Sequence, residues 1–231
     1  MSVTNNQPAV SAAPRAVLWD LDGTMIDSMG YHWQAWRDIL APRGIDLSFE
    51  QFGQTSGLRT SDLIGLFLGP DIPFAEGRQI VEAKEHRYQE TVRARGMTLL
   101  PGIEHWLIRL KAAGWRQAIA SGAPRANIDV VADVLDLTRY FETIVSADDV
   151  QRGKPDPQIF LLAAQRLGVP PERCIVIEDA PAGIEAARRA GMKSIGVLTT
   201  CSQLEADIVV PSLADLPVET LEQWGMAEGR D

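Results

Sequence analysis

The amino-acid sequence predicts an α/β fold with a doubly wound, mainly parallel sheet and an inserted, all-helical cap domain. From Pro101 onward, helical and strand-like segments alternate, which is typical of a doubly wound sheet. Between Tyr31 and Met97 only helical patterns appear, and this block is too long for a simple crossover between strands. The expected parts are a flexible tail (1–14), a core (15–28 and 98–231) and a cap at the mouth of the sheet (29–97).

The first strand and the first helix illustrate the two patterns. Ala16–Trp19 is a short apolar run, as in a strand buried on both faces. Trp33, Trp36, Ile39 and Leu40 recur at spacings of three, four and seven, as on one face of a helix. The other expected strands are Trp115–Ala120, Thr143–Ser146, Arg173–Ile177, Lys193–Val197 and Asp207–Val210. The expected helices are a first one from about Met29 to before Pro42, then Phe49–Gln54, Ser61–Leu68, Phe74–Arg95, Gly102–Ala113, Arg125–Leu135, Pro157–Leu167, Ala182–Ala190 and Val218–Trp224.

Composition excludes several classes of protein. The chain has 231 residues and a net charge of -9, without the Lys and Arg clusters that nucleic acids and anionic membranes require, so we expect neither partner. Cys174 and Cys201 have no closely spaced partner, which argues against a zinc site, a redox motif or a disulfide framework. No secretion signal or membrane-spanning run is evident, and we expect a cytoplasmic monomer.

Two acids follow the first strand directly. Asp20 and Asp22 lie in the sequence DLDGT, and Gly23 allows a tight turn there. In an open parallel sheet, the carboxyl ends of the strands form the ligand crevice, so these acids are expected to face a site. Taken alone, the motif is equally compatible with an ordinary turn after a strand.

Polar residues also follow three later strands. Because parallel strands bring their carboxyl ends to one edge, residues spread along the chain are expected to converge there. Carboxylates suit a hard divalent cation such as Mg²⁺, while a lysine and hydroxyl groups suit phosphate oxygens. This set of groups is typical of phosphoryl transfer. The converging residues are Asp20, Asp22, Thr24, Ser121, Lys154, Glu178 and Asp179.

The motifs DLDGT, GKPDP and IEDAPAGIEAARRAG occur in this order, with a serine after the second core strand. Together they resemble the haloacid dehalogenase (HAD) superfamily, in the subgroup with a helical cap that includes β-phosphoglucomutases and small sugar-phosphate phosphatases. The resemblance extends from Arg15 to the C-terminus. It implies a Rossmann-like core, Mg²⁺ as cofactor and an aspartyl-phosphate intermediate.

Roles for individual residues follow from this resemblance. It implies that Asp20 is the nucleophile and that Asp22 is the acid that protonates the leaving oxygen and then the base that activates the acceptor. Phosphate oxygens would be held by Thr24, Ser121 and Lys154. The metal would be bound by the Asp20 carboxylate, the Asp22 main-chain oxygen and Asp179, with Glu178 adjacent.

The cap is expected to determine the substrate. The segment DSMGYHWQAW resembles that of β-phosphoglucomutases, in which a histidine at the position of His32 lies over the catalytic acids; a partly buried structural histidine is the alternative. Arg59 lies in a loop that resembles a specificity loop, although its spacing from the glycine differs by one. Lys84 matches a cap lysine of the mutases, but exposed helix lysines usually serve solubility.

Two enzymatic activities remain open on this evidence. After Ser121 the chain reads GAPRANI, which resembles the phosphatases of the subgroup more than the mutases, and Arg125 could either reach a distal phosphate or begin a helix. We expect a phosphatase of a sugar or polyol phosphate, with β-phosphoglucomutase as the alternative. Asp22 disfavours a dehalogenase or a phosphonatase, and a non-catalytic phospho-acceptor or binding module is a third, weaker reading.

Overall fold

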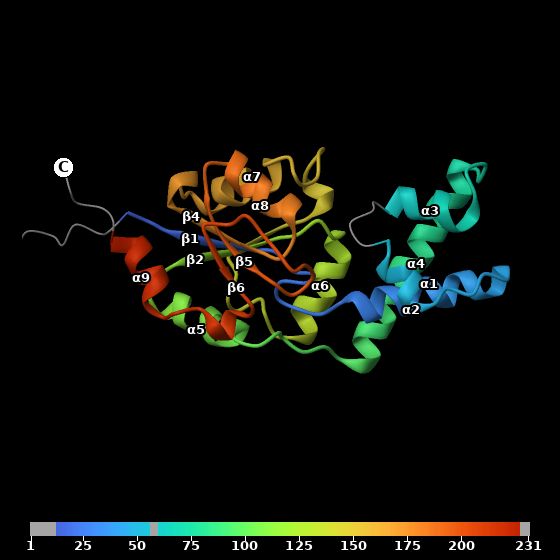
Figure 1. The fold of residues 1–231 in the computed structure, drawn as a ribbon, viewed down its shortest axis with the longest axis horizontal. Helices are drawn as coiled ribbons and strands as arrows, with labels where there is room; N and C mark the ends of the chain where they lie inside the picture. Colours follow the sequence, from blue (N-terminus) through green and yellow to red (C-terminus); the bar gives the residue numbers. More distant parts are fainter. Residues whose placement is uncertain (1–12, 56–59, 227–231) are drawn as a thin grey trace, which may run out of the picture.

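A six-stranded parallel sheet forms the centre of the computed structural model, which describes residues 13–55 and 60–226 (Figure 1). Its strand order is β3-β2-β1-β4-β5-β6, so successive strands are added first on one side of β1 and then, from β4 onward, on the other. All five strand pairings are parallel, in agreement with the predicted doubly wound sheet. The strands are β1 (Ala16–Trp19), β2 (Arg116–Ala120), β3 (Thr143–Val145), β4 (Cys174–Glu178), β5 (Lys193–Val197) and β6 (Ile208–Val210).

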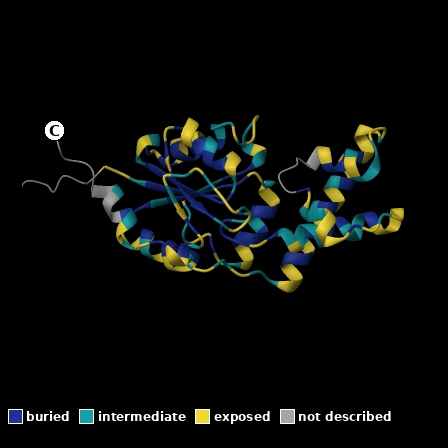
Figure 2. Cartoon of the chain, in the orientation of Figure 1, coloured by how far each residue is buried: buried dark blue, intermediate teal, exposed yellow. Residues whose placement is uncertain are grey.

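Alternate residues of the strands form two separate cores. In β1, Val17 and Trp19 belong to one core, while Ala16 and Leu18 belong to the other. The first core is completed by α5 (Ile103–Ala112), α6 (Arg125–Val134) and α9 (Glu219–Met226), the second by α7 (Gln158–Leu167) and α8 (Pro181–Arg189). In Figure 1 these helices lie on opposite sides of the sheet, and Figure 2 shows the strands between them as buried.

A block of helices follows β1 and lies beside the sheet (Figure 1). It has an apolar core of its own, which includes Trp36, Leu40 and Ile80. We call this block the cap, as predicted. Its elements are α1 (Met29–Leu40), a short 3-10 helix (Ala41–Arg43), α2 (Phe49–Gly53), α3 (Thr60–Leu68) and α4 (Phe74–Arg95).

The predicted elements agree with the structure to within one or two residues at their ends. One difference is that a 3-10 turn continues α1 through Pro42, because proline is tolerated at the start of a helical turn, where its missing N–H is not needed. Of the predicted tail, residues 1–12 lie outside the described residues. Among the described helices, none is both long enough and apolar enough to cross a membrane.

Candidate active site

Three carboxylates meet at the carboxyl ends of β1 and β4. Asp20 follows β1 directly, Glu178 is the last residue of β4, and Asp179 follows it. Because β1 and β4 are neighbours in the sheet, oxygens of all three side chains lie within 4.8 Å of one another. All three residues are buried, and we call them the acidic cluster.

Lys154 is the cation of this cluster. Its Nζ donates to Asp20 Oδ1 at 2.6 Å and to Glu178 Oε1 at 2.7 Å. Burial alone lowers the pKa of Lys154, but Asp20 and Glu178 outweigh burial and raise this pKa above its ordinary value. Lys154 is therefore held as a cation between the two carboxylates.

The two oxygens of Asp20 have different surroundings. Oδ1 accepts the hydrogen bond from Lys154, whereas Oδ2 accepts none from the residues that the structure describes. Burial raises the pKa of Asp20 well above its ordinary value, Lys154 opposes this rise, and Glu178 and Asp179 add to it. The three carboxylates are accompanied by one lysine, so a further positive charge would improve the charge balance of the cluster.

Glu178 shapes the turn between β4 and α8. Its Oε2 accepts from the backbone N–H groups of Asp179 at 2.8 Å and Ala180 at 2.7 Å, while Oε1 is bound to Lys154. A Cβ atom at Gly183 would lie only 1.8 Å from Glu178 Oε1, so this position requires glycine. Glu178 thus fixes both the turn and Lys154, and its predicted place beside the metal stays a prediction.

Asp179 is held by hydroxyl groups on both sides. Thr24 Oγ1 donates to Oδ1 at 2.8 Å, and Thr200 Oγ1 donates to Oδ2 at 2.5 Å. Gly23 has a φ of +88°, and a Cβ there would lie 2.2 Å from Asp179 Oδ2, so glycine permits the close approach. Burial, followed by the charge of Glu178, raises the pKa of Asp179 to about 6. Thr200 was not among the predicted site residues.

The predicted phosphate-binding hydroxyls are both buried at this edge. Thr24 is fully buried and donates to Asp179, so its hydroxyl supports a carboxylate in this arrangement. Ser121 follows β2, and its Oγ accepts from the backbone N–H of Ala123 at 3.1 Å. Their contact with phosphate stays a prediction.

The acidic cluster fits a divalent metal ion. Its buried carboxylate oxygens are the hard ligands that such ions prefer. Burial, and after it the charges of neighbouring carboxylates, raise the pKa of Asp20 and Asp179, and a bound cation would oppose both effects. The Asp20 and Asp179 carboxylates and the main-chain oxygen of Asp22 are the groups that would hold it.

A second group of side chains lies on the cap side of Asp22, and we call it the cap cluster: His32, Lys84 and Tyr88. His32 Nε2 lies 3.7 Å from Asp22 Oδ1, which is an ion-pair distance rather than a hydrogen bond. Oδ1 is buried and accepts no hydrogen bond from any described residue. Burial raises the pKa of Asp22, but His32 opposes burial, and with its other neighbours lowers this pKa below the ordinary value.

Lys84 orients this histidine. Its Nζ lies 3.0 Å from His32 Nδ1, and the imidazole stacks on the Tyr88 ring with centroids 4.2 Å apart. Since an ammonium can only donate, Nδ1 is the acceptor and a neutral imidazole carries its proton on Nε2, facing Asp22. Burial lowers the pKa of Lys84, although Glu85 opposes this shift. The structure thus brings His32 and Lys84 together at Asp22, while Arg59 lies outside the described residues.

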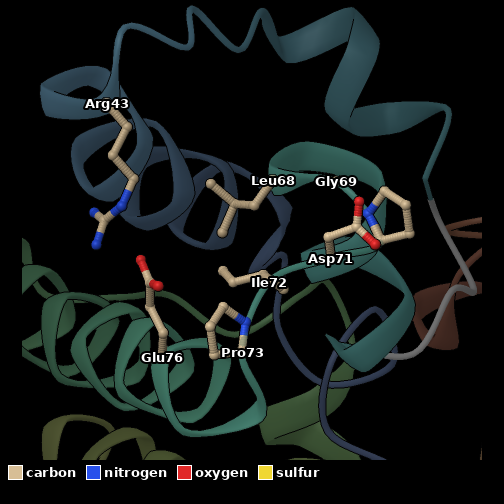
Figure 3. A pocket seen from close by; sticks show the side chains of 8 residues that line it. Arg43, Leu68, Gly69, Asp71, Ile72, Pro73 and Glu76 are labelled. Atoms are coloured by element: carbon tan, nitrogen blue, oxygen red, sulfur yellow. The ribbon is translucent and has the colours of Figure 1, made fainter.

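Arg125 has a carboxylate partner of its own, and a cavity in the cap is lined by residues of neither cluster. Arg125 begins α6, and its Nε donates to Asp129 at 2.7 Å. A cavity of about 450 Å³ lies at the far end of the cap, where Figure 3 shows Arg43 and Glu76 on one side of it. Neither the acidic cluster nor the cap cluster contributes to the lining of this cavity, so its volume does not locate the chemistry.

Comparison with known proteins identifies the family. The family model of the haloacid dehalogenase-like hydrolases matches residues 14–191. The chain belongs to this family. It is 36% identical to β-phosphoglucomutase from Bacillus subtilis, over 91% of this chain and 95% of the relative. It is 33% identical to the fructose-1-phosphate phosphatase YqaB from Escherichia coli, over 78% of this chain and 95% of the relative.

A solved structure of the family also resembles the whole arrangement. CbbY from Rhodobacter sphaeroides, crystallised as a mutant in complex with xylulose-(1,5)bisphosphate, superposes with a TM-score of 0.79 at 27% sequence identity. The match covers 88% of this chain and 96% of CbbY. The predicted combination of a HAD core with a helical cap is therefore confirmed.

Proposed function

We propose that this protein is a Mg²⁺-dependent phosphatase of a small phosphorylated metabolite, a sugar or polyol phosphate, and that Asp20 forms an aspartyl phosphate. The observation that carries the proposal is the environment of Asp20. One carboxylate oxygen is held by Lys154 at 2.6 Å, and the other accepts no hydrogen bond from the described residues. An oriented carboxylate beside a fixed cation is what in-line attack on a phosphate ester requires.

In the first step, Asp20 Oδ2 attacks phosphorus, and the bond from phosphorus to the ester oxygen breaks. Asp22 gives its proton to the departing oxygen, so that an alcohol leaves. Lys154 stabilises the charge that develops on the phosphoryl oxygens. A metal ion bound at the acidic cluster would neutralise further charge on the phosphoryl group.

In the second step, Asp22 takes a proton from water as the water attacks phosphorus. The bond between phosphorus and Asp20 breaks, which releases phosphate and restores the carboxylate. The lowered pKa of Asp22 favours the carboxylate form that this step needs. The proton that Asp22 takes from water in this step is the one that it gives to the leaving oxygen in the next turnover.

The cap residues are proposed to act on the substrate side. His32 faces Asp22 and would position this acid, and Lys84 would orient His32. Arg59, which lies outside the described residues, is proposed to contact the substrate. The names of the relatives support a sugar phosphate as substrate, because they include a β-phosphoglucomutase and a fructose-1-phosphate phosphatase.

A β-phosphoglucomutase is the second candidate. The approach of His32 to Asp22 and the higher identity to the Bacillus subtilis enzyme favour it. A mutase must also hold a second phosphate group of a bisphosphate intermediate. Of the described cations considered for this role, Lys84 is paired with Glu85 and Arg125 with Asp129, and this favours the phosphatase.

The two candidates differ in the acceptor of the phosphoryl group, and one incubation separates them. With Mg²⁺, β-glucose 1-phosphate and a trace of the 1,6-bisphosphate, a phosphatase releases phosphate, whereas a mutase forms glucose 6-phosphate without comparable release. A parallel screen of sugar and polyol phosphates identifies the substrate. Asp20→Asn should abolish both reactions, while Asp133→Asn, at an exposed position of α6, should change neither.

A further inference from the structure

Asn127 is a buried amide at the boundary between the core and the cap. It is the third residue of α6, is 2% exposed, and contacts α4 of the cap. Its Nδ2 donates to Glu85 Oε2 at 2.7 Å, and its Oδ1 accepts from Gln89 Nε2 at 2.9 Å. A carboxylate can only accept, so the amide orientation is fixed by its partners. Both ends of this core side chain are thus bound to one cap helix.

The contact continues to the catalytic acid. The other oxygen of Glu85, Oε1, accepts from Lys84 Nζ at 3.1 Å. Lys84 in turn bonds to His32, which faces Asp22. A continuous series of polar contacts therefore links Asn127 of the core, through residues of α4 and α1, to Asp22 of the core.

We propose that Asn127 is a positioning residue, which docks α4 on α6 and, through Glu85, sets the place of Lys84 and His32 against Asp22. The proposal rests on the proposed function in so far as Asp22 is the acid and base. It assigns to Asn127 and Glu85 a task that is distinct from contact with the substrate.

The burial of these groups supports the proposal. Lys84 is 4% exposed and the Glu85 side chain 15% exposed, so water competes little for their hydrogen bonds. A single displaced partner would leave a buried donor or acceptor unsatisfied, and the side chains would move to avoid this. A shift of α4 against α6 is thereby transmitted to His32.

Exchanging the amide of Asn127 and the carboxylate of Glu85 tests the proposal directly. Asn127→Asp places two carboxylates against each other, although an acid in the first turn suits the N-terminus of α6, so the helix itself is not weakened. Glu85→Gln alone places two amide groups against each other. In the double variant, the new amide at position 85 donates to the new carboxylate at position 127 and still accepts from Lys84, while Gln89 keeps its acceptor.

The expected result is a loss in Asn127→Asp that the second substitution repairs. With fructose 1-phosphate as probe, kcat should fall about tenfold in Asn127→Asp with KM changed less than about twofold, and return to within about threefold of the wild type in the double variant. Hydrogen exchange of the α1 amides should rise in the single variant and return in the double variant. An unchanged kcat and exchange in Asn127→Asp, or a double variant no better than the worse single one, would overturn the proposal.

A matched control removes the same kind of charge elsewhere on α4. Glu82 is 65% exposed and pairs with Arg78 at 3.1 Å, so Glu82→Gln should leave kcat and exchange unchanged. If the wild type turns over no phosphate ester, the proposed function fails, but the exchange of the α1 amides still decides whether Asn127 positions the cap. The two failures are therefore distinguishable.

Discussion

The acidic cluster and the cap cluster differ in what holds them. The acidic cluster comes from two adjacent strands, and turns of the backbone fix it: Glu178 binds two backbone N–H groups, and Gly23 admits Asp179. The cap cluster comes from two helices, and among the described residues its contact with Asp22 is one between side chains, that of His32. The difference indicates that the chemistry is fixed in the sheet, whereas the cap can adjust its approach to the substrate.

Substitutions of the two buried lysines, Lys154 and Lys84, test this difference between the two clusters most directly. Lys154→Met should lower kcat about 100- to 1000-fold, because the transferred phosphoryl group loses a fixed cation. In EDTA it should also lower the free energy of unfolding by about 3 kcal/mol, because Asp20 and Glu178 lose their buried partner. Turnover assays and urea denaturation measure both effects, with Lys111→Met as the exposed control. A Lys154→Met protein of wild-type stability and activity would contradict the account.

The matching change in the cap cluster is expected to have a smaller effect. Lys84→Met should lower kcat with fructose 1-phosphate about tenfold, because His32 loses its orienting donor. Burial lowers the pKa of Lys84, and Glu85, its carboxylate partner, is partly exposed, so Lys84→Met should lower the free energy of unfolding less than Lys154→Met does. The comparison fails if Lys84→Met is as inactive or as unstable as Lys154→Met.

Thr200 tests whether groups outside the motifs tune the metal site. Without its hydroxyl, Asp179 Oδ2 loses a hydrogen bond of 2.5 Å. Thr200→Val should weaken Mg²⁺ binding about tenfold, as measured by calorimetry without substrate. Thr91→Val, a similar change on α4 where the hydroxyl donates to the Arg87 carbonyl, should bind Mg²⁺ like the wild type. Equal Mg²⁺ affinities of the wild type, Thr200→Val and Thr91→Val would show that the Thr200 hydroxyl does not support metal binding.

The pH dependence of stability should show the smallest effect and only without metal. The pKa of Asp179 is raised from 3.8 to about 6, so folding favours its protonated form. This contribution is fully present below pH 3.8 and is lost as the pH rises through about 6. In EDTA, the free energy of unfolding of the wild type relative to Asp179→Asn should therefore fall over this range. If the free energy of unfolding of the wild type, relative to that of Asp179→Asn, instead rises with pH, the fold stabilises Asp179 as a carboxylate without metal, which contradicts this prediction.

The sequence predicted the acidic cluster better than the cap cluster, and for a physical reason. Strand ends of a parallel sheet meet at one edge, so the order of the motifs sufficed to bring Asp20, Lys154 and Asp179 together. Lys84 could be placed only by resemblance, since the pattern of α4 does not reveal that the lysine lies among the rings of Trp36 and Tyr88.

Other parts of the site depend on packing that no short pattern encodes. Thr200 reaches Asp179 from the segment after β5, 21 residues further along the chain, and Asn127 reaches Glu85 across 42 residues. Their identities, a threonine and an asparagine near the ends of elements, are typical of ordinary turns and helix starts. Only the folded packing distinguishes them: Thr200 contacts Asp179 within the core, and Asn127 contacts Glu85 across the boundary between core and cap.

The phosphorylation state of Asp22→Asn tests the central claim most directly. With p-nitrophenyl phosphate, whose leaving group needs little help from an acid, the first step should proceed, while hydrolysis of the aspartyl phosphate should stall without a base. Mass spectrometry should then find one phosphoryl group on the peptide that contains Asp20, and none in the variant that also carries Asp20→Asn. Phosphate release by Asp22→Asn without any phosphoenzyme, or a phosphoryl group that persists after Asp20→Asn, would contradict the account.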